Sequence, residues 1–317
     1  MKILLFAPAF YDYHERIRDE AVRQGHEVTF HAERPARWIY STTKKLPRAL
    51  RLRIFDKYLR RVLAQVRAQR FDRILLIRGE IVRPWFVTEL RRLNPSARIV
   101  LYEWDSLRVV DFSALLPVVD KALTFDPQDS TELGIDYLPL FYVPAYRIKA
   151  DADVASFDMT IVCSYHQDRY ETLKAIQSAC LEREISLETY VYIARVDYLK
   201  LKWTGKYTPE RSSVQFQMLS QKQVVDRYRR ATSILDIENN RQAGLTMRTF
   251  EALATGRNLV TTNPRTASLL PELADRIVTL DRENIQLSPS ALTHIKGDSA
   301  ALDRYSLENW LKTLLSA

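Results

Sequence analysis

The sequence predicts an α/β protein with two domains, each built around a doubly wound parallel sheet. Apolar runs typical of strands alternate with helix-like segments through both halves of the chain, as repeated βαβ units require. The pattern restarts near residue 150, and 317 residues are enough for two domains of about 150 residues. We therefore expect an amino-terminal domain at residues 1–150, a carboxy-terminal domain at residues 151–301 and a terminal helix at residues 302–317.

The order of apolar runs predicts where ligands bind. Strands of the first half are predicted within residues 2–8, 28–33, 71–80, 97–106, 115–129 and 134–144. Strands of the second half are predicted within residues 159–165, 185–195, 232–239, 258–263 and 276–285. Ligands of parallel sheets lie beyond the carboxyl ends of the strands. That rule selects, as one rim of a cleft, residues 8–13, 78–80, 103–106 and 126–128.

Composition excludes several classes of protein. The chain has 7 glycines among 317 residues, against a usual fraction of about 7%, and none are spaced as GxGxxG or GxxxxGK[ST]. This argues against a nicotinamide oxidoreductase and a P-loop NTPase. Two cysteines and five scattered histidines form no recognisable metal motif. No apolar run reaches the ~18–20 residues of a membrane span, so we expect a cytoplasmic protein.

The net charge of +8 is concentrated in residues 44–73, which hold eleven Lys or Arg and two acidic residues. Apolar residues recur there at helical spacing, at Leu52, Phe55, Leu59, Val62, Leu63 and Val66. One interpretation is a surface helix with a buried stripe and a solvated basic face. The other is an amphipathic helix that contacts anionic lipid headgroups. Few aromatic residues interleave the charges, so nucleic acid is not an expected partner.

The most informative stretch is LDIENNRQAGLTMRTFEALATGRNLVTTN, residues 235–263, which predicts a strand, a polar loop, a short helix and a strand. Thr246 is placed to cap the helix, and Arg248 and Glu251 share one side of its first turns. Helix starts attract anions, and an arginine adds a fork suited to phosphate. Because a carboxylate can accept hydrogen bonds from a ribose diol, the set suits a nucleoside diphosphate. The alternative is a mere surface pair of Arg248 and Glu251.

GLTMRTFEALATGRNLVTTN resembles the carboxy-terminal nucleotide-sugar motif of GT-B glycosyltransferases, in the retaining group related to family 4. The resemblance implies two Rossmann-like βα domains facing across a cleft, with the terminal helix packing back on the first. It implies that Glu251 binds the donor ribose and that Gly244, Leu245 and Thr246 lie at the diphosphate. The segments FAPAFYDYHERI, YEWDS, DRYETLKAI and YSLENWL resemble bacterial proteins of capsule, lipopolysaccharide and exopolysaccharide assembly.

The sequence departs from the family 4 pattern in two places. Those enzymes carry a second glutamate eight residues before the helix glutamate, and Ala243 stands at that position here. The glycine-rich loop expected after the first strand is replaced by APAFYDYH. These departures leave open an alternative function, a non-catalytic nucleotide-sugar or glycan-binding protein of the same fold.

Further candidate site residues follow predicted strands. Arg169 lies where GT-B enzymes place a basic residue at the diphosphate; alternatively, Asp168 caps the helix and Arg169 is solvated. Glu80 and Asp105 are candidate catalytic residues, because an inverting enzyme needs a general base for the acceptor hydroxyl. Asp105 could instead cap or brace a loop. Candidate contacts to acceptor or sugar are Tyr11, Tyr13, His14 and Trp104.

Together these features predict a glycosyltransferase, retaining rather than inverting, that uses a nucleotide-sugar donor. Its expected acceptor is a surface polysaccharide or a lipid-linked glycan. We expect it to need neither a metal ion nor a cofactor, because arginines and helix ends can neutralise the leaving diphosphate. Residues 44–73 are its expected contact with the inner face of the cytoplasmic membrane.

Overall fold

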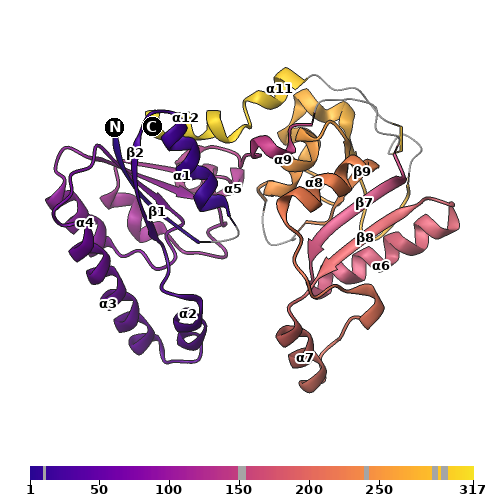
Figure 1. Ribbon diagram of the computed structural model, residues 1–317, viewed down its shortest axis with the longest axis horizontal. Coiled ribbons are helices and arrows are strands. Elements are labelled where there is room, and N and C mark those ends of the chain that lie inside the picture. The colour runs from indigo at the N-terminus through magenta and orange to yellow at the C-terminus, as the bar shows by residue number, and fades with distance from the viewer. Residues whose placement is uncertain (10–11, 149–154, 239–242, 288–291, 294–298) are drawn as a thin grey trace. The chain divides into compact units, whose positions relative to one another are not determined.

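The computed structural model describes residues 1–9, 12–148, 155–238, 243–287, 292–293 and 299–317. The chain divides into two compact units. The first comprises Met1–Leu140, Arg241–Leu245 and Leu307–Ala317, and the second comprises Phe141–Asn240 and Thr246–Ser306. Each unit contains its own parallel sheet with helices around it (Figure 1). The predicted class of two Rossmann-like α/β domains is therefore confirmed.

The first unit is built on a six-stranded sheet in the order β2-β1-β3-β4-β5-β6. Its strands are β1 (Lys2–Ala7), β2 (Glu27–Ala32), β3 (Arg73–Ile77), β4 (Arg98–Glu103), β5 (Lys121–Thr124) and β6 (Asp136–Tyr137). Its helices are α1 (Tyr13–Arg23), α2 (Arg37–Thr43), α3 (Arg48–Val66), α4 (Pro84–Leu93), η1 (Ser113–Val118), α5 (Pro127–Leu133) and α12 (Leu307–Ser316). Neighbouring strands pair in parallel, so their carboxyl ends share one edge.

The second unit is built on a five-stranded parallel sheet in the order β11-β10-β9-β7-β8. Its strands are β7 (Phe157–Ser164), β8 (Leu187–Tyr192), β9 (Ala231–Asp236), β10 (Asn258–Thr261) and β11 (Ile277–Thr279). Its α-helices are α6 (Gln167–Glu182), α7 (Arg195–Trp203), α8 (Gln221–Arg229), α9 (Met247–Ala254), α10 (Thr266–Leu269) and α11 (Ser299–Asp303). Its 3₁₀ helices are η2 (Pro144–Tyr146), η3 (Arg211–Ser213) and η4 (Pro271–Arg276).

The basic segment is helical as predicted, and its apolar stripe is the buried face of α3. The residues of that face that are buried are Phe55, Leu59, Val62 and Val66. Pro47 stands at the N-cap of α3 and separates it from α2, because proline removes a backbone donor and restricts the residue before it. Within the described residues, no helix is long and apolar enough to cross a membrane.

The terminal helix α12 is part of the first unit, where it contacts α1. Its buried residues are Leu307, Trp310, Leu311, Leu314 and Leu315. Trp310 is only 1% exposed, and its ring meets Tyr102 of β4 edge-on, with 5.0 Å between ring centroids. An ion pair of 2.7 Å between Arg23 and Glu308 links α1 to α12 at the surface. The last residues of the chain therefore complete the core of the first unit.

Replacing Trp310 tests how much α12 contributes to stability. We expect Trp310→Ala to lower the free energy of unfolding of the first unit by about 3–5 kcal/mol, because it leaves a large cavity in a packed core. Urea unfolding followed by circular dichroism measures the loss. Lys312→Ala on the same helix removes only an exposed pair with Glu308, and we expect it to cost less than about 1 kcal/mol. Equal losses for the two variants would contradict this account.

Candidate functional site

The carboxyl edge of the second sheet is organised by a buried carboxylate, Asp236, the last residue of β9. Its Oδ1 accepts a hydrogen bond of 2.9 Å from Arg248 Nη1. Its Oδ2 accepts hydrogen bonds from the hydroxyls of Thr246, at 3.2 Å, and Thr249, at 3.1 Å. Asp236 is 1% exposed, so an unpaired charge there would be costly, and these donors offset its desolvation. The start of α9 is thereby attached to the end of β9.

Thr246 stands at the N-cap of α9, as predicted, but its hydroxyl bonds Asp236 and makes no capping hydrogen bond to the helix. Met247 and the residues after it begin the helix, and Gly256 follows it with a φ of +78°. That left-handed conformation suits glycine and ends the helix where the sequence predicts. The prediction of a strand, a short helix and a strand around Arg248 and Glu251 is confirmed.

Glu251 is buried, so it is not part of a solvent-exposed pair with Arg248. Its side chain is 6% exposed, and the hydroxyl of Tyr146 in η2 hydrogen-bonds to it. Burial, and next to it the charge of Glu251, raises the pKa of Tyr146 far above its usual value. Tyr146 therefore stays a hydrogen-bond donor, and it fixes the position of the Glu251 carboxylate.

Arg169 belongs to the first turn of α6, and its partly buried side chain reaches the ends of β7 and β9. Its Nε donates to the carbonyl oxygen of Ile237 at 2.9 Å, and its Nη1 donates to that of Ser164 at 3.1 Å. Burial, followed by the nearby charge of Arg248, lowers the pKa of Arg169, and Arg282 acts in the same direction. Arg169 is thus close enough to both Arg248 and Arg282 to be repelled by their charges.

The loop after β11 supplies Arg282, which the sequence reasoning did not single out. Its Nη1 forms an ion pair of 2.9 Å with Asp168, and its Nη2 donates to the carbonyl oxygen of Glu238. Asp168 therefore does not cap α6, whose N-cap is His166. Burial raises the pKa of Glu238 to about 7. Arg282 could have been found by the rule that polar residues following a parallel strand lie at the ligand edge.

Two of the loop residues expected at the diphosphate, Gly244 and Leu245, belong to the first unit and make structural contacts there. The backbone N–H groups of Ala243 and Gly244 donate to Asp126 Oδ2, at 2.9 and 3.3 Å. Asp126 Oδ1 meanwhile caps α5 through Gln128 N–H at 2.9 Å. A Cβ on Gly244 would lie 2.5 Å from the Phe125 ring, so this position needs glycine for close packing. Leu245 is buried, at 1% exposure.

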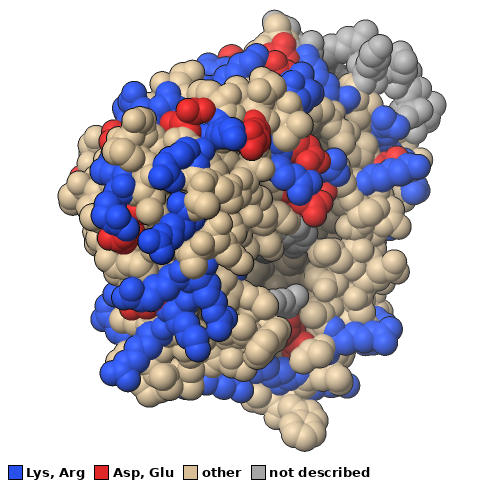
Figure 2. Space-filling model, turned by 60° about the vertical axis from the view of Figure 1, so that its left-hand side comes forward, with Lys and Arg blue, Asp and Glu red and all other residues tan. Residues whose placement is uncertain are grey.

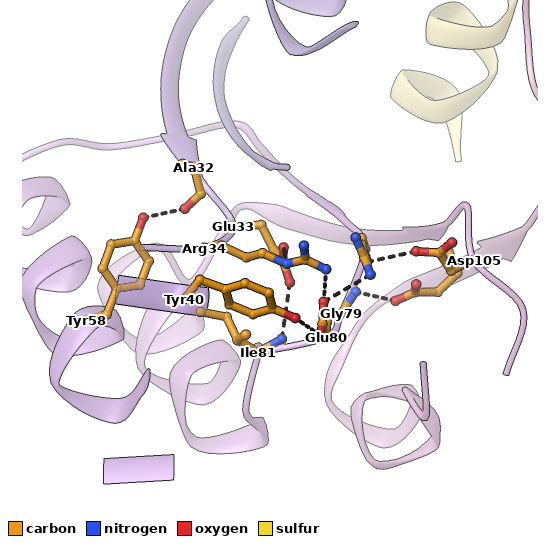
Figure 3. A network of polar contacts seen from close by, with 11 residues as sticks. Ala32, Glu33, Arg34, Tyr40, Tyr58, Gly79, Glu80, Ile81 and Asp105 are labelled. Carbon is orange, nitrogen blue, oxygen red and sulfur yellow. Dashed lines mark hydrogen bonds and ion pairs between the residues drawn. The ribbon is translucent and has the colours of Figure 1, made fainter. Parts of the chain in front are cut away.

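A second polar cluster lies at the carboxyl edge of the first sheet (Figure 3). Arg78, which follows β3, forms ion pairs with Glu80 at 3.0 Å and with Asp105 at 2.8 Å. Glu80 also accepts hydrogen bonds from Arg34 and the hydroxyl of Tyr40. Arg34 Nε lies 3.2 Å from the fully buried Glu33, which follows β2. The rim residues Glu80 and Asp105 are therefore brought together by one arginine.

The backbone beneath this cluster is strained. Arg78 has a φ of +69°, a conformation that residues with a side chain seldom adopt and that clusters at functional sites. Gly79 follows it, and its N–H donates to the buried carboxyl of Glu103. A Cβ on Gly79 would lie 2.7 Å from that carboxyl oxygen. Burial raises the pKa of Glu103 well above its usual value, so the neutral acid is favoured.

The remaining candidates that the structure describes lie at the start of α1 and after β4. Tyr11 lies outside the described residues. Tyr13 and His14 stand in the first turn of α1, and the His14 ring lies 5.0 Å from that of Phe30. Trp104 follows β4 and is partly exposed. Sequence reasoning missed Glu33 and Arg34, which directly follow β2 and obey the same strand-end rule.

Comparison with solved structures shows which fold the two units form. Acinetobacter baumannii MurG is similar with a TM-score of 0.57 and 12% identity, over 100% of this chain and 99% of that chain. The apo structure of OtsA is similar with a TM-score of 0.67 and 11% identity, over 100% of this chain and 98% of that chain. A Burkholderia xenovorans α,α-trehalose-phosphate synthase (UDP-forming), in complex with glucose-6-phosphate, is similar with a TM-score of 0.67 and 10% identity, over 100% of this chain and 99% of that chain.

These likenesses, at such low identity, show the fold alone, and that fold is GT-B. No protein-family profile matches the sequence. No curated protein matches it either. Among the residues that the structure describes, no group of three or more His, Cys, Asp or Glu side chains could hold a metal ion.

The buried acid of the first cluster makes a pH-dependent contribution to stability. Burial is the main cause that raises the pKa of Glu33 from 4.5 to about 7. Because the folded-state pKa is the higher one, the stabilisation is fully present below about pH 4.5 and is lost as pH rises through about 7. We expect Glu33→Gln to become more stable relative to wild type, by up to about 3 kcal/mol, between these limits.

Urea unfolding of both proteins at about pH 5 and about pH 8 checks this expectation, since the difference between them cancels the other titrating groups. A difference that is the same at both pH values would contradict a raised pKa at Glu33.

Proposed function

We propose that this GT-B protein is a glycosyltransferase that moves a sugar from a nucleotide-sugar donor to a surface-polysaccharide or lipid-linked glycan acceptor. The observation that carries the proposal is the cluster of Arg169, Arg248 and Arg282 at the carboxyl edge of the second sheet. The starts of α6 and α9 belong to the same edge. Three guanidinium groups and two helix ends suit a diphosphate.

The donor diphosphate would bind mainly through Arg248 and Arg282. Each side chain is 21% exposed and uses only part of its five N–H donors in its ion pair. Arg169, whose side chain is bound to the strand ends, adds positive charge to the same edge of the sheet. As the bond from the anomeric carbon to the diphosphate oxygen breaks, charge develops on the leaving nucleotide, and these preorganised donors stabilise it. The scheme uses no metal ion or cofactor.

Glu251 would accept hydrogen bonds from the ribose of the donor. An ionised carboxylate has about four acceptor positions, so it can bind a ribose hydroxyl while it keeps the hydrogen bond from Tyr146. The Burkholderia xenovorans enzyme of similar fold is a UDP-forming synthase by name, which supports a nucleoside diphosphate as the leaving group.

The acceptor would bind the first unit near Glu80 and Asp105. Both carboxylates are ion-paired with Arg78, which holds them in place and occupies oxygen atoms that a general base would need for the acceptor hydroxyl. This favours a retaining course, in which no enzymic base is needed for the acceptor hydroxyl. Tyr11, Tyr13, His14 and Trp104 remain proposed contacts to the acceptor or the sugar.

A second candidate function is binding without transfer. Ala243 stands where related enzymes use a glutamate, and its backbone N–H is held by Asp126. Donor binding without hydrolysis or transfer to any acceptor would support this alternative. Hydrolysis of the donor would support the glycosyltransferase.

The ribose role of Glu251 can be tested by calorimetry. A thermal-shift panel of UDP, GDP, dTDP, ADP and CMP first identifies the preferred base. We expect Glu251→Gln to bind that nucleotide at least about tenfold more weakly, because a charged acceptor is lost. Wild type should lose affinity by a similar factor when the nucleotide lacks its ribose hydroxyls. The Glu251→Gln variant should bind the nucleotide with and without these hydroxyls almost equally.

Glu171→Gln, an exposed change on α6, is the matched control and should bind like wild type. Independent, additive losses from the variant and from the dideoxy nucleotide would rule out direct contact between Glu251 and the ribose.

We also propose that α3 contacts an anionic membrane surface. Lys and Arg side chains are crowded on part of the surface (Figure 2). Nine basic side chains of residues 44–73 are exposed: Lys44, Lys45, Arg48, Arg53, Lys57, Arg60, Arg61, Arg67 and Arg70. Two large apolar side chains of this part of the chain are also exposed, Trp38 at 71% and Leu50 at 44%. Basic and aromatic residues together are typical of interfacial contacts.

The membrane contact predicts a charge-dependent association with vesicles. We expect the double variant Lys57→Glu and Arg61→Glu to bind phosphatidylglycerol vesicles at least about tenfold more weakly, because each basic residue contributes about 1 kcal/mol. Co-sedimentation measures the binding. Arg183→Glu with Lys222→Glu makes the same change of net charge at exposed positions of the second unit. Equal losses for the two double variants would show that net charge alone is responsible.

A further inference from the structure

The first unit has a small cavity of about 130 Å³ where α2, α3 and the segment between β3 and α4 meet. We call it the corner pocket. Its lining residues are Tyr40, Thr43, Lys44, Arg51, Leu52, Phe55, Glu80, Ile81 and Arg83. Apolar side chains and cations therefore line the same pocket, which lies next to the polar cluster of Arg78 and Glu80.

Three cations of the corner pocket, Lys44, Arg51 and Arg83, have no carboxylate partner among the described residues. Lys44 lies over the Tyr40 ring, with Nζ 5.3 Å from its centroid. The carboxylate of the pocket, Glu80, is already engaged by Arg34, Arg78 and Tyr40. The pocket therefore has a positive charge that none of the described side chains neutralises.

Two charged residues of α3 outside the pocket, Asp56 and Arg60, have structural partners at Trp85. Arg60 stacks over Trp85, with its guanidinium carbon 4.9 Å from the ring centroid. Asp56 accepts a hydrogen bond of 3.2 Å from Trp85 Nε1. The other acid of residues 44–73, Asp72, accepts a hydrogen bond of 2.7 Å from the backbone of Lys2. Neither acid is paired with Arg51.

We propose that the corner pocket binds a phosphate group of the acceptor through Lys44, Arg51 and Arg83. A phosphate has several strong acceptor oxygens. Two arginines and one lysine can therefore donate to one phosphate more fully than to one carboxylate, which has only two oxygens. The cavity has room for one such group rather than for a polymer chain. The apolar wall of Leu52, Phe55 and Ile81 suits the carbon skeleton attached to the phosphate.

The proposal rests on the proposed function, since it identifies the acceptor of that reaction as a phosphate ester. It also gives the ion-paired Glu80 a role: Glu80 holds Tyr40 and Arg34 beside the pocket and is a positioning residue. The phosphate could belong to a soluble sugar phosphate or to a lipid-linked headgroup. Both have the same recognition chemistry, so binding experiments must separate the two sources.

Isothermal titration of the full chain with methyl phosphate tests the pocket directly. We expect saturable binding tighter than about 10 mM, and Arg51→Ala or Arg83→Ala should weaken it at least about tenfold. Arg51→Lys, which keeps the charge and loses the fork, should bind with intermediate strength. Arg53→Ala, an exposed change two residues along the same helix, should bind methyl phosphate like wild type. Absence of saturable binding, or equal losses for Arg51→Ala and Arg53→Ala, would overturn the proposal.

A second arm separates the sources of phosphate. Wild type and Arg51→Ala are compared on vesicles of phosphatidic acid, whose headgroup is a phosphate monoester, and of phosphatidylserine. A loss specific to phosphatidic acid indicates a lipid-borne phosphate in the pocket. Equal affinity of the two proteins on both vesicles, with the methyl phosphate loss retained, indicates a soluble phosphate ester. A loss on both vesicles, without a loss for methyl phosphate, would show that Arg51 binds anionic surfaces only and would overturn the pocket.

Nucleotide binding, measured on the same preparations, separates failure of this proposal from failure of the proposed function. Arg51 and Arg83 belong to the first unit and Glu251 to the second. Nucleotide binding without phosphate binding would reject the corner pocket and leave the donor site standing. Phosphate binding without binding of any nucleotide of the panel would reject the donor site, and with it the assignment of that phosphate to an acceptor.

Discussion

The ion pair of the buried carboxylate of Asp236 with Arg248 is the interaction on which the carboxyl edge of the second sheet depends. Asp236 ends β9, pairs with Arg248 and accepts hydrogen bonds from the hydroxyls of Thr246 and Thr249 at the start of α9. A buried charge of this kind is stable only when it is fully partnered, so strand end and helix start must stay together. The same arrangement fixes the orientation of Arg248 and leads the chain into the turn that carries Glu251.

The two units use the same construction with different balances of charge. In each, a carboxylate follows or ends a strand and an arginine spans neighbouring loops. In the polar cluster of the first unit, four acids outnumber two arginines. Burial there favours the neutral form of Glu103 and raises the pKa of Glu33. In the second unit, three arginines gather at one edge. The edge of the second sheet therefore carries the larger excess of positive charge, which is why we propose the diphosphate site there. In the first unit, the cations that we propose for a phosphate lie in the corner pocket instead.

Much of the candidate site could be predicted because position along a strand is a local property. Glu80 and Asp105 follow apolar runs, and they do lie at the carboxyl edge of their sheet. Their partners could not be predicted in this way. Arg34 reaches Glu80 from 46 residues away, and Tyr146 reaches Glu251 across a distance in the chain that spacing does not encode. Such pairings depend on which strands are neighbours and on their register.

The sequence alone determined the two α/β domains, the short helix between Thr246 and Gly256, and the absence of glycine-rich phosphate loops. Those features follow from periodicity, capping and composition, which act over a few residues. Only the tertiary structure decided that Gly244 is needed for packing on Phe125, that Arg248 pairs with Asp236 and that Glu251 is buried. The physical reason is that burial and ion pairing are set by the packing of distant segments, which a one-dimensional pattern does not specify.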